Sequence, residues 1–337
     1  MKQFLLVVSF LLSRCIYAQS ENFTIHSIKL PAALAEPENQ FSGLQIAGSK
    51  LYLLPECRIQ EPGHTARLYT INLSEIDRQL KDSSYHITYD EINIFGLYKI
   101  RDLIAKQGQQ FEGLEAFIIN GKTIYFSVEP TTESTECFLL KGKMIEGNIY
   151  LDEQLTIIKK PTMKDGSLIY NASFEAIGLT KKKLYSFYEY NYFDKNYVPV
   201  YNRKLASSSR DSAFIEALPF RITDITPVGN HHYTAINFFY KGADKNRVYR
   251  VPPADSIAYG HIYSNGVYND YCSLVDIEYR NNQFNWKTIW EFPKNYTGYN
   301  WEGIAAYKNG YFVINDKYTL KKPYSSVLIY LQKKPEK

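Results

Sequence analysis

The chain has 337 residues, with 39 Lys and Arg against 35 Asp and Glu, so its formal net charge is only +4. This weak charge, with no basic cluster interleaved with aromatic residues, argues against a nucleic-acid-binding protein. The 30 tyrosines suit strands and half-wet surfaces better than helices. The length is sufficient for one large all-β domain with its own core.

The N-terminal segment has the pattern of a secretory signal peptide. Lys2 precedes a short apolar run from Phe4 to Leu12, and the small residue Ala18 stands before a polar one. The run is too short to span a bilayer, and no later segment approaches the ~20 apolar residues that a spanning helix needs. We therefore predict that residues 1–18 are removed and that the mature protein has no membrane span.

The mature chain, residues 19–337, is expected to form a single domain and to be secreted or periplasmic. A bacterial lipoprotein anchor at Cys15 is the less favoured alternative, because Arg14 stands where that signal requires a small residue. Three cysteines remain after cleavage, and their spacing matches no zinc motif. At most one disulfide can form among them, so disulfides are not the main source of stability. They are Cys57, Cys137 and Cys272.

Short strand signals dominate the chain, and the best helical pattern is the short segment from Leu73 to Leu80. A repeat organises these strands. In three copies a turn signal is followed by a Leu/Ile-Tyr pair and, four residues after the Tyr, by a Glu. Two weaker copies follow, one from Tyr233 to Phe239 and one from Tyr311 to Asp316. The three clear copies are Leu51 to Glu56, Ile124 to Glu129 and Leu184 to Glu189.

A polar residue stands nine residues before the first residue of each aligned pair, and four of the five are carboxylates. Glu112 is a rival in the second unit, because Phe111-Glu112-Gly113 has the same pattern as Trp301-Glu302-Gly303; its use would lengthen the hairpin by three residues. The five aligned positions are Ser42, Glu115, Glu175, Asp224 and Glu302.

Each repeat unit predicts a four-stranded blade, and such blades arranged radially form a β-propeller. Five blades are favoured. A sixth blade between Asp255 and Trp290 is the alternative. The last unit lacks a fourth strand after Val327 to Leu331, and the N-terminal segment Phe23 to Leu30 would supply it. This closure is expected because an open ring would leave an unpaired sheet edge.

The first strand of each blade lines the central channel, so the five aligned residues should converge at one mouth of it. An outer set from the second strands should lie on the same face. Carboxylates brought this close repel one another and favour a bound cation, and an all-oxygen ligand set suits Ca²⁺. An architectural ring without metal is the alternative. The outer set is Glu56, Glu129, Glu189 and Asp316.

Other chemistry-bearing residues carry weaker signals. His231 and His232 are expected in a surface turn on the opposite face, and His64 in a loop near the acids. Three cations on the acidic face could bind an anionic substrate, or could only balance the neighbouring carboxylates. They are Arg58, Arg67 and Lys317.

The hydrophobic-Glu-Gly/Ala pattern, the Leu-Tyr pair and the closing Glu resemble those of the esterase-like-phytase and SdiA-regulated propeller groups. The order Ser, Glu, Glu, Asp, Glu is also similar to the central ring of the calcium-activated nucleotidases (apyrases). That resemblance implies a central calcium held by Ser and Glu side chains. The chain has Glu56-Cys57-Arg58 where the apyrases have Asp-Asp-Arg, which weakens the expectation of nucleotide hydrolysis.

Two functions follow from these patterns. The favoured one is a monomeric binding module that presents its acidic, Tyr-rich face to a small molecule, glycan or peptide. The alternative is a calcium-dependent hydrolase of ester or phosphate-type substrates, in which one outer carboxylate activates water. The candidates for that role are Glu129, Glu189 and Asp316.

Overall fold

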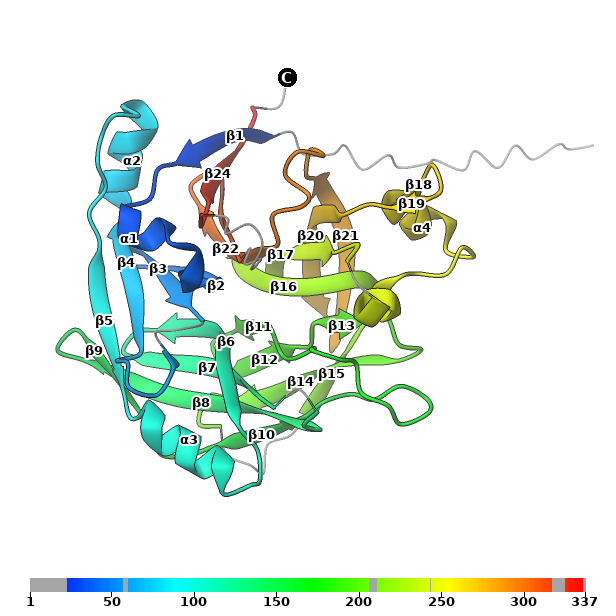
Figure 1. The fold of residues 1–337 in the computed structure, drawn as a ribbon, viewed down its shortest axis with the longest axis horizontal. Helices are drawn as coiled ribbons and strands as arrows, with labels where there is room; N and C mark the ends of the chain where they lie inside the picture. Colours follow the sequence, from blue (N-terminus) through cyan, green and yellow to red (C-terminus); the bar gives the residue numbers. More distant parts are fainter. Residues whose placement is uncertain are drawn as a thin grey trace, which may run out of the picture.

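The computed structural model describes residues 23–56, 60–131, 133–205, 211–242, 244–316 and 325–335. Its main strands form five blades of at least four strands each, arranged around a central axis (Figure 1). The protein is therefore an all-β, five-bladed propeller, as the repeat predicted. The predicted signal peptide at residues 1–18 and the possible anchor at Cys15 lie outside the described residues, as do Cys57, Arg58 and Lys317.

The blades follow one another in chain order, and the first-named strand of each blade lies nearest the axis. Blade 1 has β2 (Phe41–Ala47), β3 (Lys50–Pro55), β4 (Arg67–Asn72) and β5 (Asp90–Phe95). Blade 2 has β6 (Phe111–Asn120), β7 (Thr123–Pro130), β8 (Glu136–Ile145) and an outer edge made of β9 (Asn148–Leu151) and β10 (Thr156–Lys159). Blade 3 has β11 (Ala176–Leu179), β12 (Lys183–Phe187), β14 (Asn196–Asn202) and β15 (Asp211–Ile215).

Blade 4 has β16 (Leu218–Gly229), β17 (His232–Phe239), β20 (Tyr271–Arg280) and β21 (Gln283–Glu291), and the short β13 (Tyr190–Asn191) pairs with β16. Blade 5 has β22 (Trp301–Tyr307), β23 (Gly310–Asn315), β24 (Leu328–Lys333) and β1 (Phe23–Ile28). The alternative of a sixth blade between Asp255 and Trp290 is wrong, because that stretch supplies the two outer strands of blade 4.

The N-terminal strand closes the ring. β1 pairs antiparallel with β24, with Ile25 opposite Leu331. Phe23 packs its ring against Trp290 of blade 4 at a centroid distance of 5.1 Å. The outer edge of blade 5 is therefore formed by the start of the described chain, as predicted, and β24 is not left as an unpaired edge.

Tight turns join the two innermost strands of each blade, and another joins the outer pair of blade 4. The β20–β21 hairpin turns at Asn281 and Asn282, whose φ angles of 52° and 62° both lie in the left-handed region. Two consecutive residues of this kind are typical of a type I′ turn, whose twist matches that of the flanking strands. Asn tolerates the conformation better than most residues.

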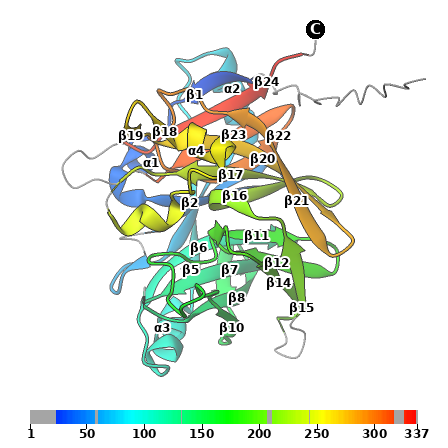
Figure 2. The same ribbon diagram turned by 90° about the vertical axis from the view of Figure 1, so that its right-hand side faces the viewer.

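The helices lie in the connections between strands. The predicted helix from Leu73 to Leu80 is α2 (Leu73–Lys81), between β4 and β5. The other helices occur where the chain enters or leaves the ends of the strands near the predicted acidic mouth, and Figure 2 shows them on one side of the ring. They are α1 (Ala32–Ala35), the 3-10 helix η1 (Pro37–Asn39), α3 (Leu97–Ala105), the 3-10 helix η3 (Asp244–Tyr249) and α4 (Ser256–Ile262), which precedes the hairpin of β18 (Tyr263–Ser264) and β19 (Val267–Tyr268).

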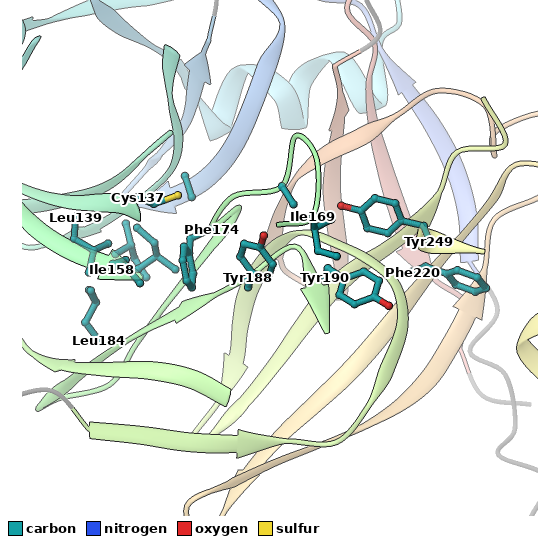
Figure 3. Close-up of a cluster of buried hydrophobic side chains, with 14 of the residues drawn as sticks. Cys137, Leu139, Ile158, Ile169, Phe174, Leu184, Tyr188, Tyr190, Phe220 and Tyr249 are labelled. Carbon is teal, nitrogen blue, oxygen red and sulfur yellow. The ribbon is translucent and has the colours of Figure 1, made fainter. Parts of the chain in front are cut away.

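Hydrophobic side chains fill the spaces between neighbouring blades. One such cluster joins blades 2 and 3 and extends to blade 4 (Figure 3). It contains Cys137 from β8 and Leu184 from β12, both fully buried. Cys137 and Cys272 are both free thiols, so no disulfide links them. No helix in the described ranges is long and apolar enough to cross a bilayer.

Candidate metal centre

β-Bulges stand at the start of the inner strands, where the sequence placed its polar residues. In β22, Trp301 pairs with Asn315 and Gly303 with Ile314, so Glu302 has no partner in the register. Ser42 in β2 is bypassed in the same way. A bulge leaves one residue out of the ladder and re-aims its side chain. The aligned polar residue is thus left out of the ladder in three of the five repeats; in β16 the residue left out is Thr223, next to Asp224, and Glu175 lies just before β11.

Strand β6 has two such bulges, one at Glu112 and one at Glu115. Glu112 is exposed, whereas Glu115 is 5% exposed. Gly113 stands between them. A Cβ atom at Gly113 would lie 2.5 Å from Oε1 of Glu115 and 3.2 Å from Cγ of Glu56. Glycine at this position therefore permits Glu56 and Glu115 to approach each other. Of the two glutamates at the bulges, Glu115 is the buried one.

Three carboxylates lie closest together. One oxygen from each of Glu56, Glu302 and Asp316 lies within 4.8 Å of the others. The Asn300 side chain, just before β22, holds part of this triad: its Nδ2 donates to Oε1 of Glu302 at 2.5 Å and to the backbone oxygen of Asp316 at 2.7 Å. All three side chains are half-buried. The triad joins one residue of the predicted inner set to two of the outer set.

The triad and its neighbours form one electrostatic unit, called the acid cluster below: Glu56, Glu115, Glu175, Glu302 and Asp316. Burial, followed by the charges of Asp316 and Glu175, raises the pKa of Glu56 well above its usual value. Burial and then the same two neighbours raise the pKa of Glu302. Burial raises the pKa of Asp316 to about 6. As expected for crowded carboxylates, they cannot all ionise without a compensating charge.

Burial, then the charges of Glu56 and Glu175, also raises the pKa of Glu115 well above its usual value. Glu175 accepts a hydrogen bond from the Ser173 hydroxyl at 2.7 Å. Burial raises its pKa, followed by the nearby charges of Glu189 and Glu129. The pKa shifts that these carboxylates cause in one another link residues of blades 1, 2, 3 and 5 around the axis.

Two further carboxylates flank the cluster, and each has a buried cation. Glu189 lies 2.8 Å from Nη1 of Arg221 and accepts a hydrogen bond from the Tyr249 hydroxyl at 3.0 Å. Glu129 lies 3.5 Å from Nζ of Lys160, whose side chain is fully buried. Burial raises the pKa of Glu129 to about 7, with Lys160 acting in the opposite direction.

Ser42 and Asp224, the other two residues of the predicted inner set, bond the backbone. Oγ of Ser42 donates to the backbone oxygen of Leu114 at 3.2 Å. The Asp224 carboxylate accepts from the backbone N–H groups of three residues on three inner strands. The structure therefore brings Glu115, Glu175 and Glu302 together and gives Asp224 backbone partners instead.

The remaining candidate residues lie away from the cluster. His231 has φ = 65° in the turn before β17, on the opposite face as predicted. His64 is exposed in the loop before β4. Arg67 pairs with Glu91 on the surface at 2.6 Å, so it balances a strand neighbour and does not reach the acids.

The arrangement fits a hard cation. Two oxygens bound to one Ca²⁺ at 2.3–2.6 Å can be at most about 5 Å apart, which the spacing of the triad satisfies. A second observation points to the same ligand: Oδ1 of Asp316, in the triad itself, is buried and has no hydrogen-bond partner, and the same is true of Oε1 of the neighbouring Glu115. A buried oxygen without a partner costs about 1–3 kcal/mol, and a cation would satisfy it. Carboxylate oxygens without thiol or imidazole suit Ca²⁺ rather than zinc.

Sequence reasoning missed the groups that balance the flanking acids. Arg221 stacks its guanidinium over the Tyr249 ring at 4.4 Å, and Tyr249 comes from η3, far from Glu189 in the chain. Gln60 was also missed; its Oε1 accepts from the Leu114 N–H at 2.8 Å, which ties the loop after Glu56 to β6. None of these residues belongs to the repeat, so no periodic signal marked them.

The fold and the site together define a five-bladed propeller with a central, half-buried acid cluster. No protein-family model matches the chain, and no curated protein sequence does. The resemblances to the phytase-like and apyrase groups therefore remain expectations from short motifs.

Solved structures similar to this chain include a GH43_1 enzyme from Xanthomonas citri complexed with xylotriose, at 9% identity and a TM-score of 0.48, covering 91% of this chain and 90% of that one. The RS223 β-xylosidase matches at 10% identity and a TM-score of 0.47, covering 88% and 93%. The phage phi92 endosialidase matches at 6% identity and a TM-score of 0.42, covering 94% and 70%. At these values the description of the fold rests on the strand topology alone.

Proposed function

We propose that the protein is a hydrolase that binds Ca²⁺ in its acid cluster. The observation that carries the proposal is the convergence of Glu56, Glu302 and Asp316 within 4.8 Å, at one mouth of the channel. A half-buried group of like charges with raised pKa values is expensive for folding unless it performs a task. The hydrolase, the alternative in the sequence analysis, is preferred to the pure binding module because Glu129, whose pKa lies at about 7, stands beside the cluster as a candidate for proton transfer.

The triad would hold the ion, with Oε1 of Glu115 completing its surroundings and Asn300 fixing the position of Glu302. A bound Ca²⁺ would polarise a substrate oxygen as a Lewis acid. The half-burial of the triad limits the competition of water with these interactions, which makes them stronger than on an open surface.

Of the three carboxylates considered for proton transfer, Glu129 fits best. Glu189 is held by both Arg221 and Tyr249, and Asp316 belongs to the triad. Among the described residues Glu129 has Lys160 as its one ion-pair partner, at 3.5 Å, and its pKa of about 7 allows it to take and return a proton near neutral pH. It would accept a proton from the attacking water, and the leaving group would then take up that proton.

The first test is calcium binding. Calorimetric titration of the metal-free protein with Ca²⁺ should show a site that is lost in Glu302→Gln and kept in Glu278→Gln, a carboxylate on β20 outside the cluster. The second test is a screen of chromogenic glycosides, esters and phosphates, with calcium and with a chelator. The proposal expects calcium-dependent turnover of at least one class, reduced at least 100-fold in Glu129→Gln.

The results separate the two functions. Calcium binding without turnover of any class would support a binding propeller with a structural ion. No calcium binding, together with unchanged melting in chelator, would support the architectural ring and overturn the proposal.

A further inference from the structure

We propose that an aromatic groove at the rim of the propeller is a binding subsite for a neutral oligosaccharide chain that reaches the acid cluster. The groove, called the outer groove below, is lined by residues of α3 and of the ends of β5 and β9. These elements lie at the periphery of the ring (Figure 1). Its volume is about 880 Å³. The inference names a substrate class for the proposed hydrolase and therefore rests on that proposal.

Three exposed aromatic side chains line the outer groove. Phe95 is 40% exposed, Tyr98 62% and Tyr150 44%. The rings of Phe95 and Tyr150 stack at 5.1 Å with an interplanar angle of 29°. Single exposed aromatics are common, but a group of them in one concave surface marks a binding site.

Polar groups stand beside these rings in the same groove. They include His64, Arg101 and Asp102. Nη2 of Arg101 is buried and has no hydrogen-bond acceptor, and Arg101 forms no ion pair within the described ranges. Its guanidinium is therefore not committed to a carboxylate of the protein. Flat aromatic faces beside hydrogen-bonding groups suit a ligand that is apolar on its ring faces and hydroxylated at its rim.

Size favours a chain of sugars over a protein partner. A volume of about 880 Å³ lies within the range of roughly 300–1,000 Å³ that small-ligand sites occupy. A stable protein interface buries on the order of 1,200 Å² or more of surface and is usually flatter. A sugar ring with its hydroxyl groups suits this mixed aromatic and polar lining.

A second cavity lies next to the outer groove, on the side of the acid cluster. This inner cavity has a volume of about 330 Å³ and is lined by Glu56 of the triad and by Glu112. It shares Pro62, Arg101 and Ala105 with the outer groove. An extended ligand could thus lie with one end at Glu56 and the other on Tyr98. The adjacency of the two cavities favours a chain of several sugar units over one small molecule.

The test uses neutral xylo-, arabino-, cello- and manno-oligosaccharides of two to six units as probes, with calorimetric titration of the full chain in calcium. The affinity of at least one series should rise with chain length. Tyr98→Ala should weaken binding of the longest member about tenfold, and Tyr98→Phe should retain it. Tyr197→Ala removes an aromatic that is 52% exposed and lines neither cavity, so it should bind as the wild type does.

Failure of this inference differs from failure of the proposed function. If calcium binding and turnover are found but affinity does not depend on chain length or on Tyr98, the subsite is wrong and the hydrolase stands. If length-dependent binding through Tyr98 is found without calcium binding, the subsite stands and the hydrolase is wrong. Absence of binding by every probe overturns the subsite.

Discussion

The carboxylate of Asp224 on the inner strand of blade 4 accepts a hydrogen bond from the backbone N–H of Ile304 on the inner strand of blade 5, at 2.8 Å. The same side chain accepts from the N–H of Leu44 in blade 1 at 3.4 Å and from that of Ile225 at 2.8 Å. One buried carboxylate thus ties three inner strands around the axis, and its acidic character serves the architecture.

Replacement of Asp224 should therefore affect folding more than calcium binding. Asp224→Ala leaves three buried N–H groups without an acceptor, at about 1–3 kcal/mol each. Because the contact with Leu44 is long, at 3.4 Å, we expect the free energy of unfolding to fall by an amount in the lower part of that range, roughly 3–5 kcal/mol. Urea denaturation measures this change. Asp224→Asn keeps one acceptor oxygen and should lose less. A folded Asp224→Asn protein with wild-type stability but no calcium affinity would instead make Asp224 a ligand.

Glu302→Gln should separate the repulsion between the triad carboxylates from their binding of calcium. The amide oxygen can still accept from Asn300, while one negative charge is removed beside Asp316. Without calcium the melting temperature should rise by a few degrees, because repulsion is reduced. With calcium the stabilisation, about 3 kcal/mol at 100 times the dissociation constant, should largely disappear. Calorimetric melting with calcium and with chelator measures both, and equal calcium shifts in variant and wild type would contradict the assignment.

The calcium-free protein should lose stability as the pH rises. The folded-state pKa values of Glu129 and Asp316 lie at about 7 and about 6, above those of the unfolded chain. Between the unfolded and folded values the native state binds more protons, so the free energy of unfolding falls with increasing pH. For Glu129 the loss is on the order of 3 kcal/mol between about pH 4.5 and 7, and it levels off above that.

Urea denaturation at a series of pH values in chelator measures this loss, and saturating calcium should flatten the profile. Stability that is constant or increases from pH 5 to pH 8 without calcium would show that the carboxylates are not crowded in solution.

Ring closure depends on the strand β1. A chain that begins at residue 29 would lose the pairing of Phe23–Ile28 with β24 and the contact of Phe23 with Trp290. We expect a lower melting temperature and self-association through the exposed edge of β24. Size-exclusion chromatography and thermal melting measure both. A chain that begins at residue 23 is the matched control, and equal behaviour of the two would mean that β1 is dispensable.

Much of the site could be read from the repeat. The spacing between each acidic position and its Leu-Tyr pair placed Glu115, Glu175 and Glu302 at the starts of inner strands or just before them, and the structure places them in one electrostatic unit. The choice between Glu115 and Glu112 could not be made from spacing, because both match the motif and both stand at bulges. Burial decides between the two residues, because Gly113 permits the close approach of Glu115 to Glu56.

The acidic hairpins that first suggested a propeller also determined its five blades, the closure by β1 and the face on which the acids lie, because hydrophobic periodicity and turn residues act locally and recur with the fold. Only the tertiary structure decided which acids meet. Glu56 joins Glu302 from the neighbouring blade 1, and Asp316 joins it from the adjacent strand end of the same blade, while Asp224 accepts hydrogen bonds from backbone N–H groups. The buried partners of Glu189 come from segments outside the repeat. Such contacts depend on distances across the ring, which no local pattern in the sequence encodes.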